Sequence, residues 1–254
     1  MNNNFYGASA YGQGGAQLHD PEAQGYSEPF GFKQANVRLG FIRKVLLIVC
    51  AQLVVTGALL TAALYSTPYR LFVVRNAWLG IVAAVAIFAT FYPLACSQRV
   101  ARSVPTNYAL LGVFTLAEGY LTSLVVYSDH ASTVHRALLL TALVVTGLTL
   151  YALFTPTDFT AMGGVLCVLG FGVLGLGILG IFFRNSTFQL IIGGVSLLVT
   201  GLYLVYDIQL MTGSGQNKYS VDDYIMAAMC IYIDILRIFL ELLRILRALD
   251  NNSR

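Results

Sequence analysis

The sequence predicts an all-helical membrane protein with seven transmembrane helices. Of its 254 residues, 57% are hydrophobic and only 11% are charged, a balance that excludes an ordinary soluble globular protein. The hydrophobic residues also fall into seven separate runs. Each run is long enough to cross most or all of a hydrocarbon core of about 30 Å, because a helix rises about 1.5 Å per residue.

The net charge of +3 is small and is scattered over the segments between the runs. Nucleic-acid binding needs a concentrated basic surface, so we expect no nucleic-acid partner. The partner that the composition does predict is the lipid bilayer.

The chain begins with a polar segment, residues 1–32, that is rich in Gly, Asn, Gln and Tyr. Such a segment cannot bury enough apolar surface to fold, so we expect a disordered tail. The membrane domain is expected to occupy residues 33–247, and a short polar tail, residues 248–254, follows it.

The first hydrophobic run follows a basic cluster between Arg38 and Lys44 and extends to Leu64. By the positive-inside rule, this cluster places the N-terminus in the cytosol. The other predicted spans are residues 78–97, 108–127, 137–154, 161–183, 188–210 and 224–246.

The loop charges agree with a cytosolic N-terminus but conflict with the side of the membrane predicted for the C-terminus. Cytosolic segments would hold Lys33, Arg38, Arg43, Lys44, Arg99, Arg102 and Lys218, against Arg70, Arg75, Arg136 and Arg184 outside. Seven spans then place the C-terminal tail, with Arg247 and Arg254, outside, against the same rule. Either the last helix does not fully cross, or its arginines extend to the far interface.

The fifth span carries a glycine every seven residues, at Gly163, Gly170 and Gly177. At helical spacing these glycines form a smooth stripe. We therefore expect another helix to pack closely against it.

The last span contains four charged residues, Asp234, Arg237, Glu241 and Arg244. Their spacing of three, four and three places them on one helix face in alternating sign. A charge at the bilayer centre costs about 2.5–3.5 kcal/mol on insertion scales, so this face is expected to look at protein or a water-filled path. We therefore expect the last helix at the centre of the bundle. The alternative is that Asp234 and Arg237 neutralise each other and only pack.

A second acid, Asp207, ends the preceding span. If Asp207 and Asp234 both face the interior, both cannot easily be ionised, and they are expected to share a proton and act as a pH switch.

Four more ionisable residues have open interpretations. Glu118, in the middle of the third span, is either a residue of the ion pathway or a protonated side chain bonded to a neighbouring helix. Arg99 and Arg102 follow the second span and either reach an acid at the cytosolic end or only fix the topology. Asp158, in a short turn, is expected to cap the fifth span.

These residues carry a resemblance to a known family. Residues 205–213 (VYDIQLMTG) and 219–240 resemble the C-terminal signature of the transmembrane Bax-inhibitor-motif family, in its Lifeguard branch. Residues 37–45, 105–120 and 158–160 are similar to it as well, and the resemblance covers about residues 33–247.

The resemblance implies a fold of two three-helix layers around a central last helix. It implies a pH-sensitive calcium leak from an internal store, in the Golgi or endoplasmic reticulum or another membrane, with protection against cell death. It implies no enzyme activity and no cofactor beyond calcium as permeant ion. The aspartates that match Asp207 and Asp234 would hold the pH sensor, and either Arg99 or Arg102 would latch it. Calcium prefers about 6–8 oxygen ligands, so Asp207 and Asp234 would bind it only weakly and transiently. Arg237 departs from the family pattern, where an uncharged residue is expected, so it is expected to modulate the sensor.

Two other functional classes stay open. A non-conducting regulator would bind apoptosis proteins through its helices or tail. An intramembrane aspartyl protease would also place aspartates on adjacent spans, but its second aspartate lies in a Gly-x-Gly-Asp motif, whereas this chain has Ile231-Tyr-Ile-Asp234.

Overall fold

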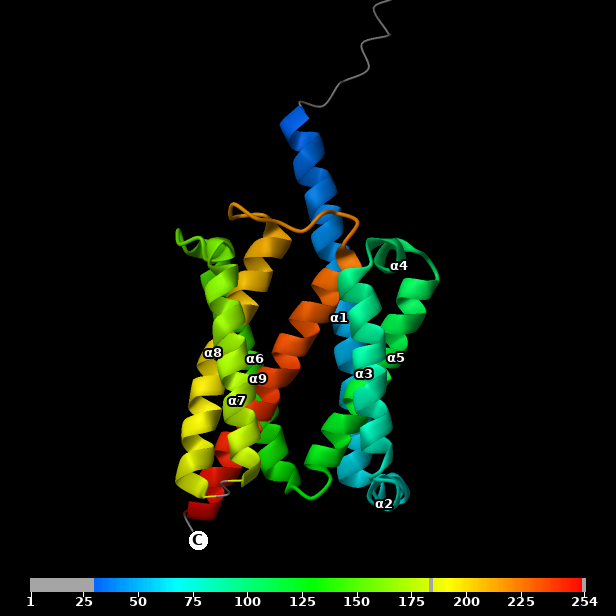
Figure 1. Ribbon diagram of the computed structural model, residues 1–254, viewed down its shortest axis with the longest axis vertical. Helices are drawn as coiled ribbons and strands as arrows, with labels where there is room; N and C mark the ends of the chain where they lie inside the picture. The colour runs from blue at the N-terminus through cyan, green and yellow to red at the C-terminus, as the bar shows by residue number, and fades with distance from the viewer. Residues whose placement is uncertain (1–29, 183–184, 253–254) are drawn as a thin grey trace, which may run out of the picture.

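The computed structural model describes residues 30–182 and 185–252, and these residues form helices without any strand (Figure 1). The helices are α1 (Phe30–Tyr65), α2 (Thr67–Arg75), α3 (Leu79–Cys96), α4 (Gln98–Arg102), α5 (Thr106–Val126), α6 (Ala131–Phe154), η1 (Phe159–Met162), α7 (Gly163–Phe182), α8 (Ser186–Thr212) and α9 (Tyr224–Asn252). The predicted disordered tail lies outside the described residues, except that residues 30–32 open α1.

Six helices are long and apolar enough to cross a membrane: α1, α3, α5, α6, α7 and α8. They correspond to the first six predicted spans, and their outward faces are strongly apolar. Leu47, Phe88, Leu139 and Phe171, for example, are 71–74% exposed. Such a surface suits hydrocarbon rather than water, so the chain is a multi-pass membrane protein.

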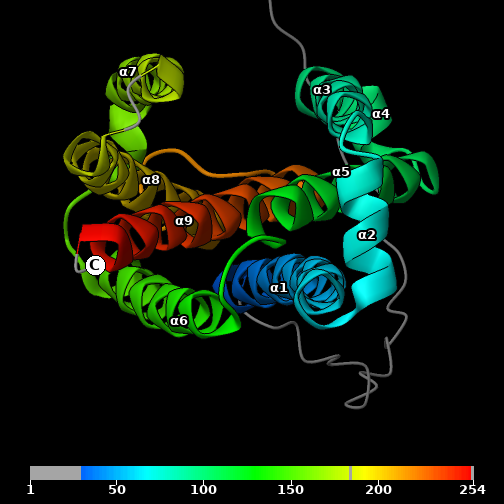
Figure 2. The ribbon, with the colours of Figure 1, turned by 90° about the horizontal axis from the view of Figure 1, so that it is seen from below.

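The helix α9 has 29 residues but carries more charge than the other six. It runs from the end of the bundle near α4 to the end near α2 (Figure 1). Along the way it packs against α8, α6, α1 and α5 (Figure 2). Tyr232, Ile238 and Leu243 are completely buried in these contacts. The prediction that the last helix is buried among the others is therefore confirmed.

Two ion pairs join the C-terminal end of α9 to the residues around it. Arg247 donates to Asp129 in the turn between α5 and α6, with Nε 2.7 Å from Oδ1. Arg136 of α6 lies 2.8 Å from Asp250. Of the two arginines predicted for the tail, Arg247 thus belongs to α9 and needs no contact with lipid headgroups, while Arg254 lies outside the described residues.

The glycine stripe on α7 packs against tyrosines of α8 at two of its three positions. A Cβ atom at Gly163 would lie 3.0 Å from the hydroxyl oxygen of Tyr206, and one at Gly170 would clash with Tyr203. The Tyr203 hydroxyl donates to the carbonyl of Leu166 at 2.6 Å. Close packing is confirmed at these two glycines. Gly177 instead faces open space and lines a cavity.

Candidate functional site

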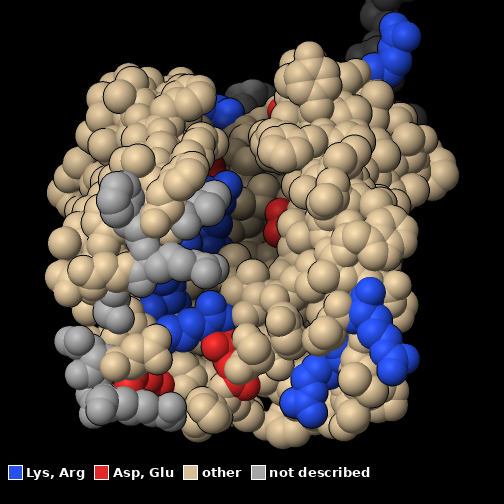
Figure 3. Space-filling model, turned by 60° about the horizontal axis from the view of Figure 1, so that its bottom comes forward, with Lys and Arg blue, Asp and Glu red and all other residues tan. Residues whose placement is uncertain are grey.

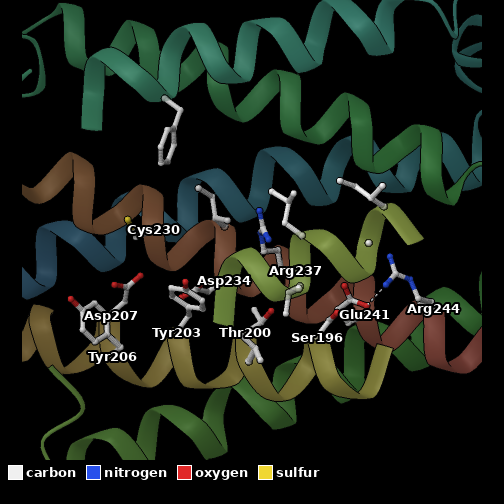
Figure 4. Close-up of a pocket in the computed structure, with 18 of the residues that line it drawn as sticks. Ser196, Thr200, Tyr203, Tyr206, Asp207, Cys230, Asp234, Arg237, Glu241 and Arg244 are labelled. Atoms are coloured by element: carbon white, nitrogen blue, oxygen red, sulfur yellow. Dashed lines mark hydrogen bonds and ion pairs between the residues drawn. The ribbon is translucent and has the colours of Figure 1, made fainter. Parts of the chain in front are cut away.

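A cavity of about 730 Å³ lies between α7, α8 and α9 (Figure 4), and Phe91 of α3 also lines it. The four charged residues of α9 that the spacing places on one face, Asp234, Arg237, Glu241 and Arg244, all line it. Figure 3 shows a hollow in the surface where basic and acidic residues gather. The four side chains therefore share one cavity, as their helical spacing predicts.

Asp207 of α8 and Asp234 of α9 meet at one end of the cavity. Each of the two residues is only 6% exposed, and their carboxyl groups interact with each other. The second carboxyl oxygen of Asp234 is buried and has no hydrogen-bond partner among the described residues. Two buried carboxylates so close together need a proton or a cation between them, because mutual repulsion and lost hydration oppose double ionisation.

Tyr219, in the loop between α8 and α9, supplies a donor to this pair. Its hydroxyl donates to Oδ1 of Asp207 at 3.3 Å. Burial raises the pKa of Tyr219 far above the ordinary value for tyrosine, and the charge of Asp207 raises it further. The hydroxyl therefore keeps its proton at every physiological pH and is a fixed donor.

Arg237 points into the cavity without a direct partner. Within the part of the chain that the structure describes, no hydrogen bond or salt bridge holds its guanidinium, whereas Arg244 lies 2.8 Å from Glu241. The charge of Arg237 nevertheless acts on Asp234, Glu118 and Glu241. The structure therefore contains no direct bond between Asp234 and Arg237.

Glu118 on α5 is half-buried and does not line the cavity. It lies near a polar cluster between α1, α5 and α9, and its charge acts on Tyr232, whose hydroxyl is 2.7 Å from that of Thr56. The structure therefore places Glu118 within electrostatic reach of Arg237 but not on the same wall as the aspartates.

The two candidate latch arginines lie away from the aspartate pair. Arg99 is exposed. Arg102 donates through Nε and Nη2 to Oδ1 of Asp223, at 3.0 and 2.9 Å. Because Asp223 immediately precedes α9, Arg102 ties α4 to the start of α9. In this structure neither arginine contacts Asp207 or Asp234.

The loop that carries Tyr219, residues 213–223, is held at two further points. Arg38 of α1 donates to the carbonyl oxygens of Tyr219 and Leu210, at 2.6 and 2.5 Å. Asp158 accepts from the backbone of Thr160 and of Gln216, each at 2.9 Å. The predicted cap at Asp158 is confirmed for η1, and the same side chain also binds the loop.

Replacing Asp158 should loosen this loop. The hydrogen bonds from Thr160 and Gln216 lower the pKa of Asp158, so its contribution to stability is full above the ordinary aspartate pKa of about 3.9 and is lost as the pH falls through the lower folded value. At pH 7 the contact is intact. We expect Asp158→Asn to speed hydrogen exchange across residues 213–223 several-fold, measured by mass spectrometry. Asp222→Asn in the same loop is the control, and equal exchange in both variants would contradict the assignment.

The geometry adds residues that the sequence did not single out. Tyr219 lies inside a motif that was noted only for its resemblance, and Arg38 was interpreted only as a topology signal. The hydroxyls of Ser196 and Thr200 on α8 also line the cavity. Their spacing of four residues is one helical turn, which places them on the same face of α8.

Comparison with known proteins shows which family the chain resembles. The family model described as "Inhibitor of apoptosis-promoting Bax1" matches residues 38–251, which span α1 to α9. Protein lifeguard 3 of Homo sapiens is 32% identical over 235 residues, covering 90% of this chain and 76% of that protein. Protein lifeguard 4 of Mus musculus is 32% identical over 222 residues, covering 85% and 87%. Protein LIFEGUARD 3 of Arabidopsis thaliana is 33% identical over 238 residues, covering 87% and 90%.

Proposed function

The chain belongs to the Bax-inhibitor family, with Lifeguard proteins among its relatives, and we propose that it is a pH-sensitive calcium leak channel. It acts in an internal membrane, the Golgi or endoplasmic reticulum, where it modulates calcium stores and protects against cell death. It is not an enzyme, and calcium is its permeant ion rather than a cofactor.

The observation that carries this proposal is the buried carboxyl pair at one end of the cavity. Asp207 and Asp234 offer oxygen atoms, which calcium prefers, and one oxygen of Asp234 has no partner among the described residues. A proton and a calcium ion compete for such a pair, so binding must depend on pH. Two side chains supply too few ligands for tight binding, which favours passage over storage.

The cavity provides a route along α9. The hydroxyls of Thr200 and Ser196 follow the carboxyl pair along α8, and the ion pair of Glu241 with Arg244 lies further along α9. Polar groups at this depth in a membrane protein normally line a path for ions or water.

The proposed membrane arrangement has seven spans. The six apolar helices and α9 all cross, and the six form two three-helix layers around α9. The N-terminus then lies in the cytosol, and loop 213–223 with the Arg102–Asp223 ion pair lies on the cytosolic side.

Calcium flux by the purified protein in liposomes tests the function. The protein is reconstituted with a calcium-sensitive dye inside, and flux is measured at several pH values between about 5.5 and 8, the range in which a shared proton would leave. We expect flux that depends on pH. Absence of flux at every pH would instead favour a non-conducting regulator that binds apoptosis proteins. Cleavage of a transmembrane peptide substrate would favour the aspartyl-protease alternative.

Protease access to terminal tags tests the topology. With a tag at each end of the chain in sealed microsomes, we expect only the N-terminal tag to be cut from the cytosolic side, because an odd number of spans separates the two ends. Detergent-opened microsomes are the control, in which both tags must be cut. Cleavage of both tags in sealed microsomes would contradict the seven-span arrangement.

Glu118→Gln tests whether Glu118 takes part in the ion pathway. The charge of Arg237 acts on Glu118, so removing the carboxylate should change calcium flux by about twofold to tenfold without loss of expression. Flux in liposomes, normalised to the amount of reconstituted protein, measures the effect. Wild-type flux in the variant would show that Glu118 only packs.

A further inference from the structure

Arg237 presents its guanidinium to the cavity without a hydrogen bond or ion pair in the described residues, whereas Arg244 is paired with Glu241. The charge of Arg237 is balanced only at a distance, by Asp234 one turn before it on α9 and by Glu118 on α5. The N–H groups of Arg237 therefore lack an acceptor at membrane depth, where an unsatisfied polar group is costly.

The facing wall of α8 offers hydroxyl groups. Ser196 is 1% exposed, and its hydroxyl oxygen has no hydrogen-bond partner among the described residues. Ser196 and Thr200 line the cavity opposite Arg237 and Arg244 of α9 (Figure 4). These two residues make the wall that faces the arginines polar, while the N–H groups of Arg237 are the donors with which an anion would pair.

The third wall is apolar. Val173, Leu174 and Ile178 of α7 line the cavity, and Phe91 of α3 lies across from them. At Gly177 there is open space where a side chain would stand. In Figure 3 the hollow is open at the surface of the molecule, and in Figure 2 α7 and α3 stand at separate corners of the bundle. Hydrocarbon, rather than water, suits this wall.

We propose that this part of the cavity binds an anionic amphiphile, in which an acyl chain carries a carboxylate or phosphate head. The head lies between Arg237 and Arg244, and the chain lies along α7. A planar guanidinium binds carboxylate and phosphate through paired hydrogen bonds. The volume of about 730 Å³ is that of a typical small-molecule site. This proposal concerns binding alone and does not depend on ion conduction.

A binding assay on the purified full-length protein tests the proposal. Oleate and oleoyl lysophosphatidic acid are the anionic probes, oleyl alcohol is the neutral probe, and acetate and inorganic phosphate are the probes without a chain. Equilibrium dialysis in a non-ionic detergent measures each affinity. We expect saturable binding of at least one anionic amphiphile, and the tighter of the two identifies the head as carboxylate or phosphate.

Arg237→Gln should weaken that binding by about tenfold or more, because a charge-assisted hydrogen bond is lost. Gly177→Leu should also weaken it, because the new side chain fills the space along α7, and Arg75→Gln on α2, outside the cavity, should not. Thermal unfolding checks that each variant is folded. Equal affinity in Arg237→Gln, or equal affinity for oleyl alcohol, would overturn the proposal. Full competition by acetate or phosphate alone would replace it with a small-anion site.

Discussion

Asp234→Asn is expected to flatten the pH dependence of calcium leak. The proposed sensor is a proton shared between Asp207 and Asp234, and an amide of the same shape cannot take or release it. A titrating group changes its ratio of protonated to ionised forms about tenfold per pH unit, so wild-type flux should vary by about that factor on one side of its midpoint. Variant flux should stay within about twofold over the same range. Liposome flux at matched protein density measures both.

Two further variants make this test specific. Asp207→Asn should have the same effect, because the proton belongs to both carboxyl groups rather than to either one. Asp222→Asn, in the exposed part of the loop between α8 and α9, should leave the pH response unchanged. A normal pH response in Asp234→Asn would remove the aspartate pair from the mechanism.

The shared face of α9 could be predicted because it depends only on helical spacing. Asp234, Arg237, Glu241 and Arg244 were placed together by a period of about 3.6 residues, and all four line the cavity. Asp207 could be added because a carboxylate near the end of an apolar span is costly without a partner. These inferences need only local geometry and the low polarity of the membrane.

The contacts of loop 213–223 could not be predicted in the same way. Arg38 and Tyr219 are 181 residues apart, and Arg102 and Asp223 are 121 residues apart. No periodicity connects residues across such distances, since their meeting depends on how α1, α4 and α9 pack. The short helices α2 and α4 were missed because nine and five residues are too few to show a pattern above the loops around them.

Arg102 illustrates the difference between what spacing predicts and what only packing decides. Its position after the second span correctly placed it at the α4 end of the bundle, but several acids lie within the reach of a long side chain there. The structure selects Asp223 and not its neighbour Asp222. Charge and position thus restrict the partners of an arginine, and only the packed fold chooses among them.

Arg237 is the residue through which this chain is expected to differ from its family pattern. Its guanidinium is permanently charged, points into the cavity and acts on Asp234 without bonding to it. A nearby positive charge favours the ionised form of a carboxyl group, so under the proposed function Arg237 is expected to help the aspartate pair to release its proton. The pair would hold that proton to higher pH if the charge were absent.

Arg237→Asn should therefore keep the pH dependence of calcium leak but move its midpoint upward by about one unit. The direct contact between Arg244 and Glu241 remains in the variant, so the rest of the charged face is preserved. Arg237→Lys is the matched control, because it retains a positive charge and should leave the midpoint within about half a unit of wild type. Flux in liposomes over a fine pH series measures the midpoint of each variant. If the midpoint of Arg237→Asn equals that of wild type, the guanidinium does not act on the sensor, and the departure of this chain from the family pattern has no part in its response to pH.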